Sequence, residues 1–188
     1  MSIGTVLFDA DGVIQRTPNG WVDRLRAVCP ENADQFVNDV FAAEEPCLRG
    51  RGDFAQALTD ILSRHRCSMT TSQALALWHQ IDPDREALEI VRRLSKRGVT
   101  TGIATNQQSY RAQFMKERLG YGRLFDREFY SCEIGYAKPT IEFFEKVVRA
   151  LNTDPSKVLF IDDKKENVSA AASLGIQTLQ FHVGSGSR

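Results

Sequence analysis

The stretch VLFDADGVIQ, residues 6–15, joins an apolar run to two acidic residues. The letters VLF are typical of a buried strand. Asp9 and Asp11 follow directly, and Gly12 behind them favours a turn. Carboxylates two residues apart repel each other, so positive charge must lie nearby. Other parts of the sequence indicate where that charge comes from.

Length and charge limit the possible functions. A chain of 188 residues is long enough for one sizeable core with an insert. Its 24 Lys and Arg balance its 24 Asp and Glu, so we expect neither nucleic acid nor an anionic membrane as partner. The start of the sequence lacks a signal-peptide pattern, and the spread cysteines form no C-x-x-C motif. These features predict a cytoplasmic protein, a monomer or a homodimer, with reduced thiols.

Strand-like and helical patterns alternate along the sequence, which favours an α/β fold with a parallel sheet. The helix after the insert is predicted to begin at Asp82 and Pro83 and to end at Gly98. Further helices are predicted near residues 110–119, 141–151 and 168–174. The predicted strands cover residues 3–8, 99–104, 127–131, 158–161 and 177–181.

The region from 16 to 82 differs from the rest. It shows four helical patterns rich in aromatic residues and leucine, without a convincing strand. We therefore expect a small helical bundle inserted after the first strand. The end of the sequence, 184–188, is small and polar and is expected to fray.

Polar residues follow the predicted strands where a parallel sheet binds ligands. Several carboxylates in one place require a cation, and oxygen ligands without His or Cys favour Mg²⁺. A lysine, a hydroxyl, the backbone N–H groups of 10–12 and a helix N-terminus near Asn106 suit a phosphate. The candidate side chains are Asp9, Asp11, Thr105, Asn106, Lys138, Asp162 and Asp163.

Four short stretches carry a family resemblance. They are FDADGVI (8–14), IATN (103–106), AKPTIEFF (137–144) and FIDDKKENV (160–168). In this order they resemble the four motifs of the haloacid dehalogenase superfamily. The resemblance implies a Rossmann-like catalytic core, residues 1–15 and 83–188, and a helical cap, residues 16–82.

The resemblance also implies roles for individual residues. Asp9 is expected to be the nucleophile that becomes an aspartyl phosphate, with Lys138 neutralising phosphate charge. Asp11 is expected to serve as general acid and then base, and to bind metal through its backbone carbonyl. Asp9 and Asp163 are expected to bind the metal directly, and Asp162 directly or through a water.

Two further predictions concern residues around this set. Asn167 lies one helical turn beyond Asp163 and is expected to orient that carboxylate. Arg49 and Arg51, between glycines in CLRGRGD, are expected to contact the phosphorylated substrate.

The acid at position 11 favours phosphoryl chemistry over dehalogenation, because the dehalogenases lack a carboxylate there. The first lysine is Lys96, beyond the insert, so the Schiff-base lysine of related phosphonate hydrolases is missing. We expect a Mg²⁺-dependent phosphatase acting on a small phosphomonoester, a sugar phosphate or similar metabolite. The alternatives are a sugar phosphomutase resembling beta-phosphoglucomutase, and a non-catalytic binding or regulatory protein on the same fold.

Overall fold

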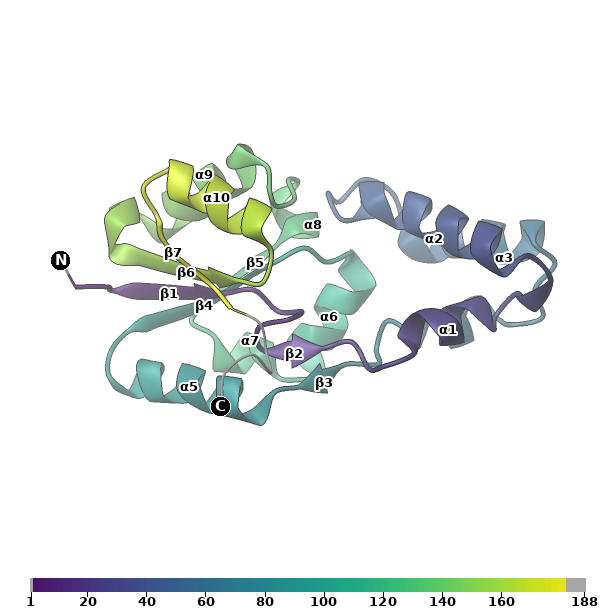
Figure 1. The fold of residues 1–188 in the computed structure, drawn as a ribbon, viewed down its shortest axis with the longest axis horizontal. Coiled ribbons are helices and arrows are strands. Elements are labelled where there is room, and N and C mark those ends of the chain that lie inside the picture. The colour runs from purple at the N-terminus through teal and green to yellow at the C-terminus, as the bar shows by residue number, and fades with distance from the viewer. Residues whose placement is uncertain (1, 182–188) are drawn as a thin grey trace.

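A five-stranded parallel sheet forms the centre of the protein (Figure 1). The computed structural model describes residues 2–181, so the expected frayed end at 184–188 lies outside the described residues. Each predicted strand is present, with ends shifted by one or two residues. In spatial order the strands are β5 (Arg127–Tyr130), β4 (Thr100–Thr105), β1 (Thr5–Phe8), β6 (Val158–Asp162) and β7 (Gln177–Gln180).

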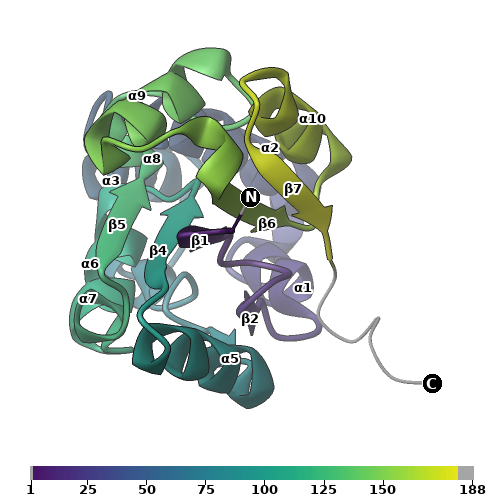
Figure 2. The same ribbon diagram turned by 90° about the vertical axis from the view of Figure 1, so that its left-hand side faces the viewer.

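Helices cover both faces of the sheet (Figure 2). Side chains alternate along β1: Val6 and Phe8 join the apolar cluster of one face, and Leu7 joins the cluster of the other. This arrangement confirms the predicted α/β class. The first face packs against α5 (Arg85–Lys96), α6 (Ser109–Glu117) and α7 (Tyr121–Leu124), and the second against α9 (Ile141–Leu151) and α10 (Lys165–Ser173). The short elements α8 (Ser131–Ile134) and η2 (Pro155–Lys157) complete this part.

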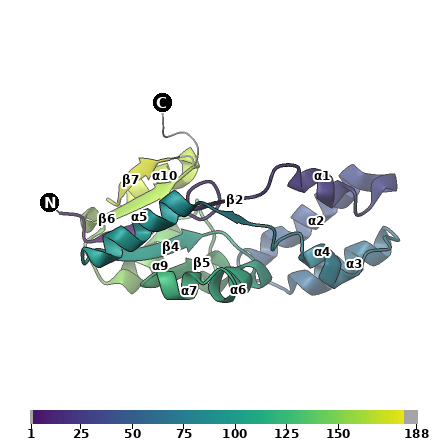
Figure 3. The same cartoon turned by 90° about the horizontal axis from the view of Figure 1, so that it is seen from below.

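A group of helices, here called the helical lobe, lies beyond the ends of the strands (Figures 1 and 3). It has an apolar cluster of its own, centred on buried Phe36, Phe54 and Trp78. No helix within residues 2–181 combines the length and the apolar character needed to cross a bilayer. The lobe contains α1 (Trp21–Arg26), η1 (Pro30–Asn32), α2 (Ala33–Cys47), α3 (Phe54–Arg64) and α4 (Thr71–Leu75).

A two-stranded antiparallel ribbon joins the lobe to the sheet. It pairs β2 (Gln15–Arg16) with β3 (Asp82–Pro83). The prediction that a helix begins at Asp82 and Pro83 is therefore wrong, because these residues pair with β2. The helix begins at Arg85, and the carboxylate of Asp84 caps it by accepting a hydrogen bond from the Ala87 amide at 2.9 Å. Both limits of the predicted cap fall on this ribbon, and the division into core and cap stays a prediction.

Candidate active site

Asp9 lies directly after the central strand β1, where its amide donates to the carbonyl of Ile161 at 2.8 Å. The residue is only 6% exposed, and the Nζ of Lys138 lies 2.8 Å from its Oδ1. Burial raises the pKa of Asp9 to about 6, with Asp162 adding to the rise and Lys138 opposing it. The positive charge near Asp9 thus does not fully compensate the cost of burying its carboxylate.

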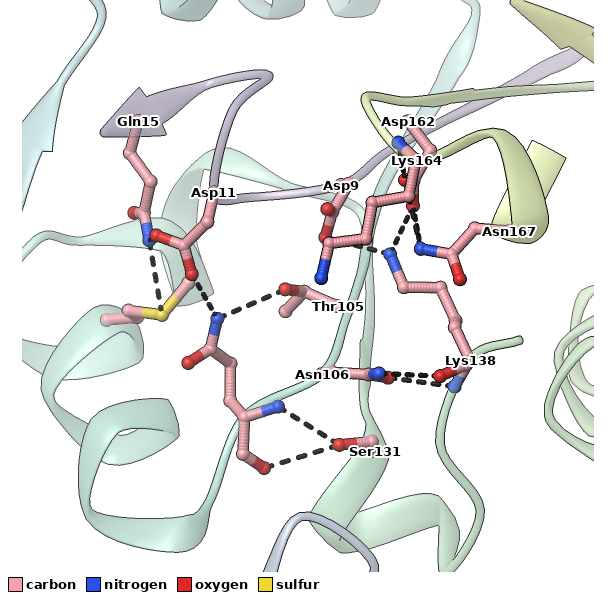
Figure 4. Close-up of polar contacts among 12 residues, drawn as sticks. Asp9, Asp11, Gln15, Thr105, Asn106, Ser131, Lys138, Asp162, Lys164 and Asn167 are labelled. Atoms are coloured by element: carbon pink, nitrogen blue, oxygen red, sulfur yellow. Dashed lines mark hydrogen bonds and ion pairs between the residues drawn. The ribbon is translucent and has the colours of Figure 1, made fainter. Parts of the chain in front are cut away.

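Lys138 is the ammonium that the opening stretch requires. Its Nζ contacts Asp9 at 2.8 Å and Asp162 at 2.6 Å, and Figure 4 shows it between the two carboxylates. The Asn106 side chain holds the lysine backbone on both sides, with Nδ2 donating to the Lys138 carbonyl at 2.8 Å and Oδ1 accepting from the Lys138 amide at 2.9 Å. Asn106 therefore fixes the position of the lysine.

Asp162, at the end of β6, is fully buried and held from several sides. Its Oδ1 accepts from the backbone amide of Lys164 at 2.8 Å. The Asn167 amide lies 3.0 Å from both carboxylate oxygens. Asn167 thus orients Asp162, five residues before it, and its expected role in orienting Asp163 stays a prediction.

Three carboxylates converge here: one oxygen each from Asp9, Asp162 and Asp163 lies within 4.8 Å of the others. Gly12 leaves room for this, because a Cβ on it would approach Asp163 Oδ2 to 2.6 Å. Two of these acids, Asp9 and Asp162, share the one positive charge of Lys138, at 2.8 Å and 2.6 Å, which leaves negative charge on this pair. Oxygen donors with excess negative charge fit a hard divalent cation such as Mg²⁺.

Asp11 belongs to a second polar cluster. Arg111 donates to both of its oxygens, from Nη1 at 2.6 Å and Nη2 at 2.9 Å. Gln107 and Gln15 donate to it from their side-chain amides at 2.9 Å and 3.0 Å. Burial alone would raise the pKa of Asp11, but Arg111 and these amides outweigh it and hold the pKa below its ordinary value. Asp11 is thus held as an anion.

Sequence reasoning missed Arg111, Gln107 and Gln15. Gln107 comes two residues after Thr105, just before α6, and Arg111 lies four residues further, in the first turn of the helix. Their position shortly after Thr105 was the signal in the sequence that could have indicated these residues. It did not reveal their partner, Asp11, because the contact spans 100 residues of chain.

Thr105 ends β4 and is buried beside the acidic residues. Its Oγ1 accepts a hydrogen bond from Gln107 Nε2 at 3.2 Å, which leaves the hydroxyl hydrogen available to another acceptor. Figure 4 shows Thr105 between the Asp9 and Asp11 clusters. This position is compatible with its predicted contact to phosphate, which stays a prediction.

Some of the predicted backbone donors are already engaged. The amide of Gly12 donates to the carbonyl of Gln15 at 2.8 Å. At the start of α6, Gln108 Oε1 accepts from the amides of Tyr110 and Arg111 at 2.7 Å and 3.2 Å. A side chain thus caps two amides of this helix N-terminus, and its expected contact with phosphate stays a prediction.

Arg49 and Arg51 lie in the loop that follows α2. Arg49 pairs with Glu45, at 2.5 Å between Nη1 and Oε1, and Arg51 is exposed. Neither lines the cavity of about 270 Å³ that Glu44 and Arg111 share. Their contact with substrate stays a prediction.

Known proteins share both sequence and fold with this chain. A phosphorylated carbohydrates phosphatase of Thermotoga maritima is 27% identical over 183 residues, covering 93% of this chain and 82% of that protein. A sesquiterpene phosphatase of Aspergillus oryzae is 34% identical over 99 residues, and the chain covers 50% of its length.

A solved structure agrees over almost the whole chain. It is a haloacid dehalogenase family enzyme of Bacteroides thetaiotaomicron in complex with magnesium and inorganic phosphate, with a TM-score of 0.83 and 20% identity. The superposition covers 98% of this chain and 97% of that one, so the two share a fold. The sequence pattern of one family matches residues 3–175. With the acids and the lysine of its four motifs gathered at the ends of the parallel strands, the chain belongs to the haloacid dehalogenase-like hydrolases.

Proposed function

We propose that the protein is a Mg²⁺-dependent phosphatase that hydrolyses a small phosphomonoester through an aspartyl phosphate on Asp9. The observation that carries this proposal is the buried Asp9 carboxylate, 2.8 Å from the Lys138 ammonium. A carboxylate attacks phosphorus without first losing a proton. Its environment must instead offset the negative charge of the incoming phosphate, which Lys138 can do.

In the first step, an oxygen of Asp9 forms a bond to phosphorus while the bond from phosphorus to the leaving oxygen breaks. Lys138 and the Thr105 hydroxyl stabilise the charge on the phosphoryl oxygens. The leaving oxygen takes a proton from the Asp11 carboxyl as the alcohol departs. Asp11 must bind this proton beforehand, and its carboxyl must exchange its Arg111 contact for one to the leaving oxygen.

In the second step, water attacks the phosphorus and the bond to Asp9 breaks. The arrangement of Asp11 as an anion suits this step, in which the carboxylate accepts the proton of the water. Inorganic phosphate leaves, and Asp9 returns to its carboxylate form. Arg111 and Gln107 hold Asp11 in place for this role.

Asp9, Asp162 and Asp163, with the backbone carbonyl of Asp11, would hold the Mg²⁺ ion. When bound, the ion neutralises the charge of the carboxylates and of the phosphate. Lys138 and Asn167 keep Asp162 oriented toward this position.

The substrate class is supported by the Thermotoga maritima relative, which is a phosphatase of phosphorylated carbohydrates. The helical lobe contributes as a cap that closes over the substrate. It stands beyond the strand ends, on the side of the sheet where Asp9 and Asp162 lie (Figure 1). A cap of this kind excludes water other than the attacking molecule.

The test compares Asp9→Asn with the wild type. Phosphate release is measured from a panel of sugar phosphates and other phosphomonoesters, with Mg²⁺ and with EDTA. Release by the wild type should require Mg²⁺ and should be lost in Asp9→Asn, while mass spectrometry of acid-quenched wild type finds a phosphoryl group on Asp9. The matched control is Asp60→Asn, at an exposed site in α3. Undiminished release by Asp9→Asn would sink the mechanism.

A further inference from the structure

A cavity of about 270 Å³ lies between the helical lobe and the sheet. The lobe contributes Trp21, Glu44 and Trp78, and the core contributes Arg111 and Lys164. Arg111 also binds Asp11, and Lys164 follows Asp163, so the cavity adjoins the candidate active site. Its volume equals about nine waters at roughly 30 Å³ each, which suits a pentose or hexose.

Together with Phe41 and Leu48, two tryptophans belong to the apolar wall of the cavity. Their rings meet edge to face, with centroids 5.2 Å apart. The indole N–H of Trp21 donates to the Leu77 carbonyl at 2.6 Å, and that of Trp78 donates to Glu44 at 2.6 Å. Since both N–H groups are used inside the lobe, the rings offer only their carbon surface to a ligand. Such surface packs against the C–H face of an alcohol.

Glu44 is the hydrogen-bonding group on the lobe side. Its Oε1 accepts from Trp78, which fixes the carboxyl at the cavity. Within the described part of the chain, no hydrogen bond engages its Oε2. This oxygen can therefore accept a hydrogen bond from a ligand hydroxyl.

The charges of the cavity disfavour a second anionic group on the ligand. The charge of Arg111 is balanced by its ion pair with Asp11, and the guanidinium also donates to the Gln107 side chain and, from Nε at 3.0 Å, to the Trp78 carbonyl. Lys164 is exposed, so solvent screens its charge. When ionised, the Glu44 carboxylate repels an anion in the middle of the cavity.

We propose that Glu44, Trp21 and Trp78 select the leaving group of the substrate: an uncharged alcohol that carries at least one hydroxyl besides the esterified one. The inference rests on the phosphatase function proposed above and names its substrate class as neutral sugar or polyol monophosphates. The carbon face packs on the tryptophans, and a free hydroxyl donates to Glu44.

The first test uses three phosphates with six-carbon leaving groups. Fructose 6-phosphate has the hydroxyls, hexyl phosphate lacks them, and fructose 1,6-bisphosphate adds a second anion. We expect the wild type to favour fructose 6-phosphate at least tenfold in kcat/KM over each of the others. Glu44→Leu should lower the preference over hexyl phosphate at least tenfold, because the acceptor is lost. Glu44→Gln keeps an acceptor and should mainly reduce the discrimination against the bisphosphate.

The matched control is Glu31→Leu, at an exposed position of the lobe, which should keep all ratios. Ratios within one variant are independent of the fraction of folded enzyme. A wild type that prefers the bisphosphate or hexyl phosphate overturns the inference. So does a Glu44→Leu variant with unchanged ratios, and in both cases phosphatase activity itself remains established.

The second test does not require turnover. The protein has two tryptophans, and both line the cavity, so tryptophan fluorescence reports its occupancy. In Asp9→Asn with Mg²⁺, fructose 6-phosphate should give a saturable change that inorganic phosphate does not give. Adding Glu44→Leu should weaken this binding at least tenfold. If no phosphate is released from any probe, the proposed phosphatase fails, and this titration alone decides the inference: saturable, Glu44-dependent binding supports it, and no change overturns it.

Discussion

Arg111 holds both oxygens of Asp11, through Nη1 at 2.6 Å and Nη2 at 2.9 Å. The same guanidinium donates from Nε to the Trp78 carbonyl in the helical lobe at 3.0 Å. One side chain thus connects the lobe to the carboxylate that is proposed to move protons. This makes Arg111 a positioning residue, because it acts through Asp11.

Arg111→Lys should slow hydrolysis selectively. A lysine cannot hold both carboxylate oxygens and Trp78 together, so Asp11 loses its fixed orientation. We expect kcat for an alkyl phosphate to fall about 10- to 100-fold, and kcat for p-nitrophenyl phosphate to fall much less, because nitrophenolate leaves without a proton. Steady-state kinetics with both substrates measures the difference.

The control for this comparison is Arg118→Lys, at an exposed position just after α6. It should leave kcat for both substrates unchanged. An equal loss on the two substrates in Arg111→Lys would show that the arginine serves the fold and not the proton transfer.

The sequence was sufficient to predict which site residues lie together where their position follows from the order of the strands. Asp9 and Asp162 each sit at the end of a buried strand, and β1 and β6 are neighbours, so the sheet alone brings these carboxylates together. Lys138 was predictable for a similar reason, because it precedes a helix that packs on the same sheet. Local sequence patterns predict both these strands and helices and the residues at which they end.

The surroundings of Asp11 and the cavity wall could not be predicted in this way. Arg111 meets Asp11 across 100 residues of chain, and Trp78 meets Glu44 across 34, so neither contact follows from a local pattern. Such contacts depend on tertiary geometry, which periodicity does not contain. For the same reason, the sequence predicted a helix start at Asp82, whereas in the structure this residue pairs with β2.

Lys138→Met should destabilise the protein and make its stability depend on Mg²⁺. The change leaves Asp9 and Asp162 buried without their cation, which costs about 3–5 kcal/mol in the free energy of unfolding at pH 7. Bound Mg²⁺ should restore part of this loss by mass action. Urea unfolding with and without Mg²⁺ measures both effects.

Lys165→Met, at an exposed position of α10, is the control and should unfold like the wild type. The loss in Lys138→Met should shrink at pH 4.5, where a proton can neutralise Asp9, whose pKa is raised to about 6 by burial. A loss that is the same at both pH values and indifferent to Mg²⁺ would contradict the proposed charge balance.

Gly12→Ala should weaken Mg²⁺ binding. The glycine has φ of 88°, and an added Cβ would lie 2.6 Å from Asp163 Oδ2, so the carboxylate must move. Gly98→Ala is a matched control, because Gly98 has φ of 77° but no heavy atom within 4 Å of an added Cβ. Both variants should lose about 1–2 kcal/mol of stability from backbone strain. Only Gly12→Ala should lose Mg²⁺ affinity in calorimetric titration; equal affinities in the two variants would argue against Asp163 as a ligand.

Glu44→Gln should stabilise the protein at high pH. Burial raises the pKa of Glu44 to about 7 from 4.5, while the Trp78 hydrogen bond and Arg111 oppose the rise and Asp11 adds to it. Because the folded pKa exceeds the unfolded one, the wild type loses stability as the pH rises between these values, and the cost stays constant above them. Glutamine carries no charge, so the variant should exceed the wild type by on the order of 2 kcal/mol at pH 8 and match it near pH 4. Urea unfolding across this range checks the slope, with Glu31→Gln as control; a pH-independent difference would mean that Glu44 ionises as freely in the folded protein as in the unfolded chain.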